Sequence, residues 1–318
     1  MSTSPFLESI RTELRTRRYS IKTEKVYLYW IKQFILFNDK KHPQDMGNTE
    51  IERFLNHLAV NRQVSAATQN QALCAIIYVY KHIIRREISD LRYSFTKREQ
   101  SIPTVLTHEE ATNIISHLSG QYWLMASLLY GGGLRINEVL KLRIKDVNIQ
   151  NNTLFIFRGK GKKDRYTLLP KSLSHSLDNQ FSIVKACHQQ DLNEGYGLAS
   201  LPPALLRKYG NAAKDLSWQY VFPSSTRCTH PYDGYIYRHH IHETTFRKQL
   251  RKAVLISQIP KQVKAHTFRH TFATQLLQNG TDIRTVQELL GHSDLKTTEL
   301  YTHVIGSRFS HTTSPIDR

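Results

Sequence analysis

The segment from 266 to 304 holds residue types that could together break a phosphodiester bond. It contains His266, Arg269, His292 and Tyr301. Each of these residues alone is more often structural, because histidines and tyrosines commonly pack and arginines commonly cover surfaces. Their combination in one segment indicates a site where a tyrosine attacks a phosphate and cationic side chains assist it.

That reaction makes several chemical demands. The attacked phosphate gains negative charge on its non-bridging oxygens, which forked and permanently charged guanidinium groups neutralise. The phenol of tyrosine has a pKa of about 10, so it needs a base or strong positive charge nearby. The leaving 5′-oxygen needs a proton, which a lysine can supply. An imidazole can donate to the phosphate or shuttle a proton.

An arginine and a lysine that could complete this set lie upstream. Arg135 follows the glycines at 131–133 and stands at the expected start of a helix, where exposed amides favour phosphate. A surface arginine behind a flexible turn explains this motif equally well. Lys160 stands between two glycines in RGKGKKDR, which predicts a turn between two strands and lacks the spacing of an ATP-binding loop. We expect neighbouring cations to contact backbone or solvent: Lys162, Lys163 and Arg165.

The ordered series of these residues resembles the tyrosine recombinases. The motif elements are HTFRHTFAT, the LLGH turn, the TT pair before the tyrosine and the YTHV ending. The resemblance spans nearly the whole chain and implies that Tyr301 forms a 3′-phosphotyrosyl bond while Lys160 protonates the 5′-oxygen. Because that bond stores the phosphodiester energy, the resemblance implies no ATP. We expect no cofactor, and the absence of an HExxH motif or a carboxylate pair gives no indication of a metal.

The same resemblance implies roles for the remaining site residues. Arg135 and Arg269 would bind the non-bridging oxygens of the phosphate. His266 would assist as general base, and His292 would donate a hydrogen bond to the phosphate. Glu138 would orient Arg135 from behind.

Residues 188–243 form an insertion relative to a minimal recombinase, and this insertion resembles that of the integron integrases. Those enzymes recombine a duplex attI site with a folded single-stranded attC site, and their insertion helps hold bases that protrude from the folded strand. Aromatic, proline and histidine surfaces can stack on such bases, at about 1–3 kcal/mol per base. The candidates here are Phe157, Pro202, Trp218, His239 and His240.

Other interpretations of the insertion stay open. Its helix ends in KYGNA, where the family pattern has KYPNA, and Phe157 stands where a larger aromatic residue is expected. Packing of Trp218 onto the domain explains its presence as well as base stacking does. The cluster of His239, His240 and His242 lacks a fourth ligand partner, so we expect no metal there.

Length and composition support a DNA-acting protein. The chain has 318 residues, which predicts two domains, and 44 Lys and Arg against 26 Asp and Glu, which favours a polyanionic partner. The three cysteines are far apart, with no disulfide framework. There is no apolar signal core and no apolar run near the ~20 residues that cross a bilayer. We therefore expect a cytoplasmic, nucleoid-associated bacterial protein without a membrane partner.

The elements that position the site are predicted from periodicity and caps. Residues 1–93 show four helices, with Ser20 and Thr49 as candidate caps, and predict a helical core-binding, SAM-like DNA-binding domain. Residues 94–104 are the expected linker. Residues 105–318 are the expected catalytic domain, mostly helical, with one small sheet around Lys160 and an irregular insertion.

We therefore expect a mainly α fold with a small β-sheet, forming a C-shaped clamp around DNA. The resemblance implies that the last segment docks into a neighbouring subunit, giving a tetramer on two DNA sites. Three alternatives to an integron integrase remain. They are a duplex-acting chromosome-resolving or phage-type tyrosine recombinase, a catalytically silent DNA-binding relative, and a type IB topoisomerase, which the small size disfavours.

Overall fold

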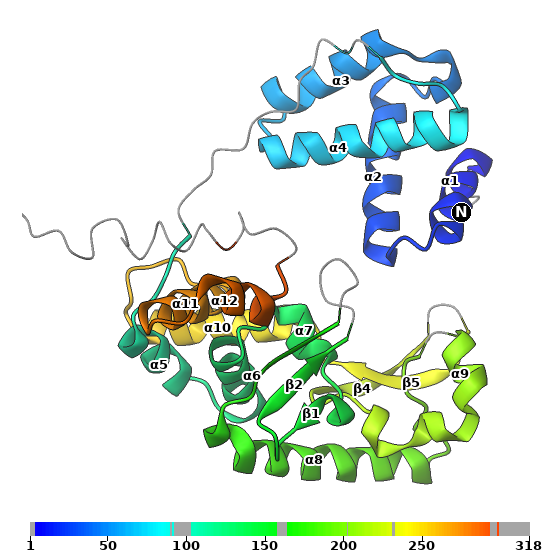
Figure 1. The fold of residues 1–318 in the computed structure, drawn as a ribbon. Coiled ribbons are helices and arrows are strands. Elements are labelled where there is room, and N and C mark those ends of the chain that lie inside the picture. The colour runs from blue at the N-terminus through cyan, green and yellow to red at the C-terminus, as the bar shows by residue number, and fades with distance from the viewer. Residues whose placement is uncertain are drawn as a thin grey trace, which may run out of the picture. The chain divides into compact units, whose positions relative to one another are not determined.

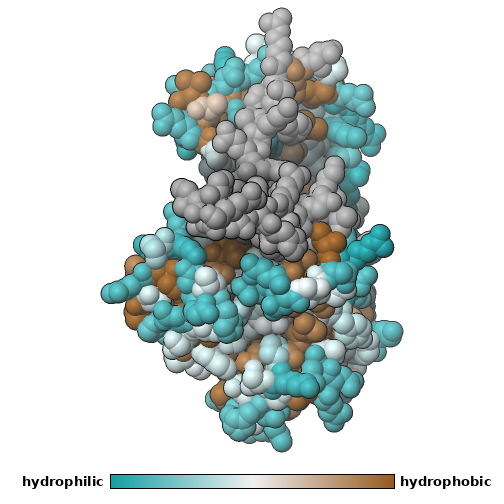
Figure 2. Space-filling view, turned by 60° about the vertical axis from the view of Figure 1, so that its left-hand side comes forward, coloured by the Kyte–Doolittle hydropathy of each residue, from teal (hydrophilic) through white to brown (hydrophobic). Residues whose placement is uncertain are grey.

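The computed structural model describes residues 4–89, 91, 103–157, 164–201, 203–230, 233–292 and 298. Its contacts divide the chain into two units, Met1–Ser101 and Ile102–Arg318 (Figure 1). Both units are mainly helical, and the second also holds small sheets, which confirms the predicted fold class. Within the described residues, no helix is long and apolar enough to cross a membrane. Figure 2 shows hydrophilic residues over much of the visible face, with hydrophobic residues in separate patches.

The first unit packs its helices around one apolar core. Its elements are α1 (Pro5–Thr16), α2 (Ile21–Phe37), α3 (Asn48–Val60) and α4 (Ala66–Val79), with the short turns η1 (Pro43–Asp45) and η2 (Tyr80–Ile84). Ser20 caps α2 through its side chain, as predicted, and Ser65 caps α4 in the same way. The predicted cap at Thr49 is wrong, because α3 begins after Gly47, whose amide donates to Glu50 Oε2 at 2.7 Å.

The second unit is built around the apolar helix α6. Its helices are α5 (His108–Ser116), α6 (Gly120–Gly131), α7 (Ile136–Lys141), α8 (Ser174–Asn193), α9 (Pro203–Tyr209), α10 (Glu243–Ile256), α11 (Ala265–Gln278) and α12 (Ile283–Leu290). Short helical turns join them at η3 (Ile144–Asp146), η4 (Lys171–Leu173), η5 (Gly210–Lys214) and η6 (Leu216–Trp218). Thr107 and Glu110 form the predicted capping box at the start of α5. Helices α5, α7, α8, α10 and α11 all pack on α6 (Figure 1).

A three-stranded antiparallel sheet contains the hairpin predicted around Lys160. Its strands are β1 (Val147–Asn148), β2 (Thr153–Ile156) and β3 (Arg165–Leu168), in the order β1-β2-β3. Ile156 pairs with Arg165 at the end of the hairpin that lies next to the connecting residues 157–164. Thr167 is buried while Tyr166 is exposed, so alternate residues of β3 face the core and solvent. Lys160 lies outside the described residues.

The insertion contains a second hairpin that the sequence did not predict. Strands β4 (Pro223–Thr229) and β5 (Ile236–His240) pair antiparallel, so the expectation of an irregular segment is wrong here. Both strands lack regular apolar alternation, and ion pairs hold the hairpin to α8. Asp191, whose side chain is 4% exposed, accepts two hydrogen bonds of 2.7 Å from Arg238 and one of 3.3 Å from Arg227.

Candidate active site

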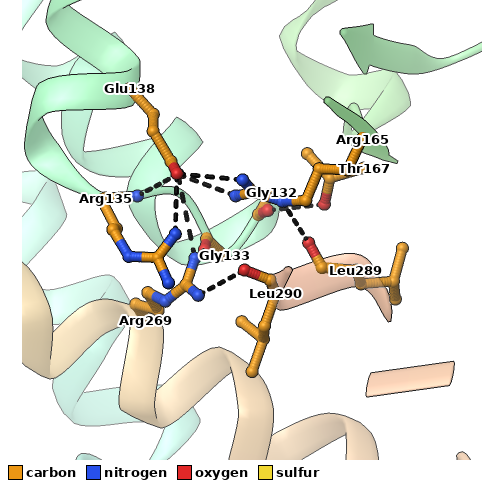
Figure 3. A network of polar contacts seen from close by, with 9 residues as sticks. All are labelled: Gly132, Gly133, Arg135, Glu138, Arg165, Thr167, Arg269, Leu289 and Leu290. Carbon is orange, nitrogen blue, oxygen red and sulfur yellow. Dashed lines mark hydrogen bonds and ion pairs between the residues drawn. The ribbon is translucent and has the colours of Figure 1, made fainter. Parts of the chain in front are cut away.

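A glycine turn after α6 brings Arg135 next to α11. Gly132 caps the C-terminus of α6, and Gly133 has φ +62°. A Cβ atom at Gly133 would lie 2.4 Å from the ring of Phe272 on α11, so only glycine allows the chain to pass this closely. Arg135 then stands at the N-cap of α7 and begins the polar cluster in Figure 3.

Glu138 is the centre of this cluster (Figure 3). Its Oε2 accepts from the Arg135 amide at 2.8 Å, and its Oε1 accepts from Arg135 Nη1 at 2.8 Å. Arg165 on β3 donates from Nη1 and Nη2 to the two carboxylate oxygens, at 2.9 and 2.7 Å. Arg269 Nη1 lies 3.8 Å from Oε2. One carboxylate therefore faces three guanidinium groups.

The ionisation of Glu138 follows from this arrangement. Its side chain is 8% exposed, and burial alone would raise its pKa. The hydrogen bonds and charge of Arg165, the amide of Arg135 and the charge of Arg269 outweigh burial and lower the pKa to about 2. Glu138 is thus ionised at neutral pH and holds the guanidinium groups in place.

Arg269 joins the glycine turn to the end of α12. Its side chain is 3% exposed, Nη1 donates to the Gly133 carbonyl at 2.6 Å, and Nη2 donates to the Leu290 carbonyl at 2.5 Å. Helix α12 ends at Gly291 with φ +63°, which confirms the positive φ predicted there. His292 follows directly, and its Nδ1 lies 2.9 Å from Thr298 Oγ1.

His266 lies one turn before Arg269 on α11. Loss of solvent around its ring lowers its pKa, and the positive charges of Arg269 and Arg135 lower it further. Its side chain is nevertheless exposed at the surface of the helix. A neutral and accessible imidazole beside two arginines has the chemistry required of a base near a phosphate.

The structure brings part of the predicted site together. Arg135, Glu138 and Arg269 share one cluster, His266 lies beside it, and His292 follows the helix end that Arg269 binds. Three predicted site residues lie outside the described residues: Lys160, Pro202 and Tyr301.

Arg165 is the residue that sequence reasoning missed. We expected it to contact backbone or solvent. Its Nε does donate to the Leu289 carbonyl at 2.9 Å, but its side chain is 8% exposed and also pairs with Glu138. A signal was present, because the alternation of a strand places Arg165 on the same face as Thr167. Thr167 is 2% exposed and donates to the Gly132 carbonyl at 2.8 Å.

The described candidates for base contacts lie on different elements of the second unit. Phe157, just beyond β2, is 56% exposed. Trp218 is half-buried, with Lys145 Nζ 3.1 Å from the centre of its ring and the ring of Tyr209 at 5.1 Å. Neighbouring groups therefore already contact part of the Trp218 ring.

His239 and His240 lie together on β5. The ring of His239 stacks on Tyr220 at 5.5 Å, and His240 meets the same ring edge-on at 5.3 Å. Burial, then the proximity of His240 and nearby cations, lowers the pKa of His239 to about 4. Burial also lowers the pKa of His240. At neutral pH this pair therefore offers uncharged ring surfaces. Within the described residues, no group of three or more His, Cys, Asp or Glu side chains is arranged to hold a metal ion.

Comparison with known proteins places the chain in a family. A model described as "Phage integrase family" matches residues 104–308, and one described as "Phage integrase, N-terminal SAM-like domain" matches residues 6–90. The chain belongs to the phage integrase family. It is accordingly an enzyme, a site-specific tyrosine recombinase, and the matched range includes every predicted catalytic position from 135 to 301.

Individual relatives agree with this assignment. A protein named Integrase/recombinase from Escherichia coli is 41% identical over 312 residues, which are 98% of this chain and 93% of that protein. Tyrosine recombinase XerD from Oceanobacillus iheyensis is 28% identical, over 95% of this chain and 93% of its own. Among solved structures, XerH recombinase bound to palindromic difH substrate is 20% identical, with a TM-score of 0.63, over 98% of this chain and 84% of that chain. A lambda integrase dimer bound to a core site is 16% identical with a TM-score of 0.60, over 95% of each chain. These structures share the fold.

Proposed function

We propose that this tyrosine recombinase is an integron-type integrase. It would cleave DNA with Tyr301, form a 3′-phosphotyrosyl intermediate and recombine duplex attI with folded single-stranded attC sites, to capture or excise gene cassettes. The observation that carries the proposal is the insertion at 188–243, because a recombinase that acts only on duplex has no need of a second surface for protruding bases.

The insertion has the properties that such a surface needs. It has a small core of its own, formed by Ala199, Leu201 and Ala213, and its hairpin is held to α8 by Asp191. A rigid support lets a ring stack on a base without ordering the protein at the moment of binding. The neutral rings of His239 and His240 suit stacking better than ion pairing with phosphate.

The catalytic roles that we propose are those implied by the family resemblance, and the arrangement of the cluster supports the roles of the arginines. Arg135 and Arg269 would neutralise the non-bridging oxygens, with Glu138 holding them from behind. His266 would act as base, and His292 would donate a hydrogen bond to the phosphate. Lys160 would protonate the leaving 5′-oxygen. The support for these roles is that one ionised carboxylate faces both arginines beside a neutral imidazole.

The same proposal extends to domains and assembly. Residues 1–93 would bind the core of the DNA site, 94–104 would link, and 105–318 would catalyse, with the two domains clamping DNA. Four subunits would assemble on two sites at the nucleoid in the bacterial cytoplasm. The net charge of +18 supports a DNA partner, since cationic surfaces gain affinity by releasing counterions.

A covalent adduct assay tests the proposal. The protein is mixed with a folded attC-like strand with protruding bases and, separately, with the same site as full duplex, and adducts are separated on a denaturing gel. Adduct mainly on the folded strand supports the integron-type function. Tyr301→Phe should bind both DNAs and form no adduct, and an adduct from this variant would contradict the assigned nucleophile.

Variants in the insertion test whether the Trp218 ring contacts protruding bases. Trp218→Ala should reduce adduct on the folded strand more than on duplex. Tyr196→Ala is the matched control, because its ring packs on Arg227 within the insertion and is not a proposed base contact. Equal losses on both DNAs for Trp218→Ala would show that this ring only supports the fold.

A duplex-acting, Xer-type recombinase is the second candidate. The relative named XerD, 28% identical over 95% of this chain, favours it. In that case adduct forms mainly on the duplex, and the insertion has a structural role.

A further inference from the structure

We infer that Arg165 is a positioning residue for DNA cleavage, which places the guanidinium groups of Arg135 and Arg269 through Glu138. This inference rests on the proposed roles of the two arginines. It extends them to a strand residue that is assigned no part in the reaction.

Arg165 joins three separate segments of the second unit (Figure 3). From β3 it donates two hydrogen bonds to Glu138 on α7, at 2.9 and 2.7 Å. Its Nε donates to the Leu289 carbonyl on α12, at 2.9 Å. The side chain is 8% exposed, so these contacts are shielded from water and hold one geometry.

Arg165 influences the positions of Arg135 and Arg269 through the contacts of Glu138. Between the described residues, Arg165 donates two hydrogen bonds to this carboxylate, and Arg135 donates two. Without Arg165 the carboxylate can rotate, and Arg135 moves with it. Among the described residues, Arg269, already 3.8 Å from Glu138, is then a cation that can take the place of Arg165. That movement draws Arg269 away from the carbonyls of the glycine turn and α12.

The stem of Arg165 also supports the turn before His292. A Cβ atom at Gly291 would lie 2.7 Å from Arg165 Cδ, so the stem packs directly against this turn. Lysine cannot replace these functions, because an ammonium group lacks the planar fork that binds two carboxylate oxygens and a carbonyl together.

The test compares two scissile phosphates in DNA that gives adduct with the wild-type protein. One is the ordinary phosphate, and the other is a methylphosphonate, in which a neutral methyl group replaces a charged oxygen. Arg165→Lys should bind both DNAs as the wild type does and cleave the ordinary phosphate roughly 100-fold more slowly in single turnover. On the neutral phosphate the deficit should shrink below about tenfold, because less charge needs neutralising.

Thr167→Val is the matched control. It removes a buried hydrogen bond to the Gly132 carbonyl from the same strand and face, whereas the hydrogen bonds of Arg165 to Glu138 stay in place. Its cleavage ratio between the two phosphates should stay that of the wild type. Gel-shift binding and thermal unfolding are measured for both variants. Unchanged binding and unfolding show that slow cleavage comes from displaced guanidinium groups of Arg135 and Arg269 and not from general loss of fold.

Arg135→Ala separates this inference from the proposed function. If Arg135→Ala cleaves the ordinary phosphate at the wild-type rate, the proposed role of Arg135 is wrong and the inference is overturned with it. Two results would overturn the inference alone, in both cases with Arg135→Ala impaired. One is that Arg165→Lys cleaves the ordinary phosphate at the wild-type rate. The other is that Arg165→Lys is slowed by the same factor, relative to the wild type, on both phosphates.

Discussion

Replacing Glu138 with glutamine tests whether one carboxylate holds the arginine cluster together. Glutamine has nearly the same shape but no negative charge, and it leaves three guanidinium groups facing an amide. The pKa of Glu138 is lowered from 4.5 to about 2. At 1.36 kcal/mol per unit, this shift corresponds to about 3 kcal/mol of stability at neutral pH. Breaking a buried ion pair typically costs about the same.

The pH dependence has a definite sign. Because the pKa of Glu138 is lower in the folded state, its contribution is complete above about pH 4.5 and is lost as the pH falls towards 2. Glutamine lacks the contribution at every pH. The difference between the wild type and Glu138→Gln in free energy of unfolding should therefore be about 3 kcal/mol at pH 7 and about 1 kcal/mol near pH 3.

Urea unfolding at both pH values measures this difference. A Trp30→Phe background leaves Trp123 and Trp218, both in the second unit, as the fluorescent reporters. The slope of free energy against urea should be the same for both proteins. A difference that does not change with pH, or one below about 1 kcal/mol at pH 7, refutes the reasoning that Glu138 is ionised and stabilising.

Three further predictions follow from particular contacts. Gly133→Ala, which places a Cβ atom 2.4 Å from Phe272 at a positive φ, should destabilise the second unit by more than about 2 kcal/mol in urea unfolding. Asp191→Asn should weaken the anchor of Arg238 and speed amide hydrogen exchange in β4 and β5 by at least about tenfold, leaving α11 unchanged. His239→Ala should weaken binding of the folded strand without changing the slope of log affinity against log salt, because this ring is neutral at pH 7.

Local sequence signals predicted the helices and their ends well. The side chain of Ser20 and the capping box of Thr107 and Glu110 act within one turn of chain, and Gly291 takes its positive φ where an apolar helix ends. The cap of α3 was assigned to Thr49 because threonine is a common cap. Gly47 occupies the N-cap position instead, and its amide donates to the Glu50 side chain.

Tertiary contacts between distant residues could not be predicted in the same way. Glu138 lies 27 residues before Arg165, and Leu289 lies 124 residues after it, so no local pattern links the three. The hairpin of β4 and β5 was missed for a similar reason. Its strands are anchored by charges on Asp191 and Arg238 and not by an alternating apolar face.

Two arginines of the cluster, Arg165 and Arg269, complete the end of a helix with their buried side chains. The last carbonyls of a helix have no partner within it and carry partial negative charge. Arg165 and Arg269 donate to the last two carbonyls of α12, those of Leu289 and Leu290. Arg269 also donates to the Gly133 carbonyl, just beyond α6. Two arginine side chains thus fix the end of α12, and one of them also holds the glycine turn that follows α6. A phosphate that enters beside them meets positive charge already held in place.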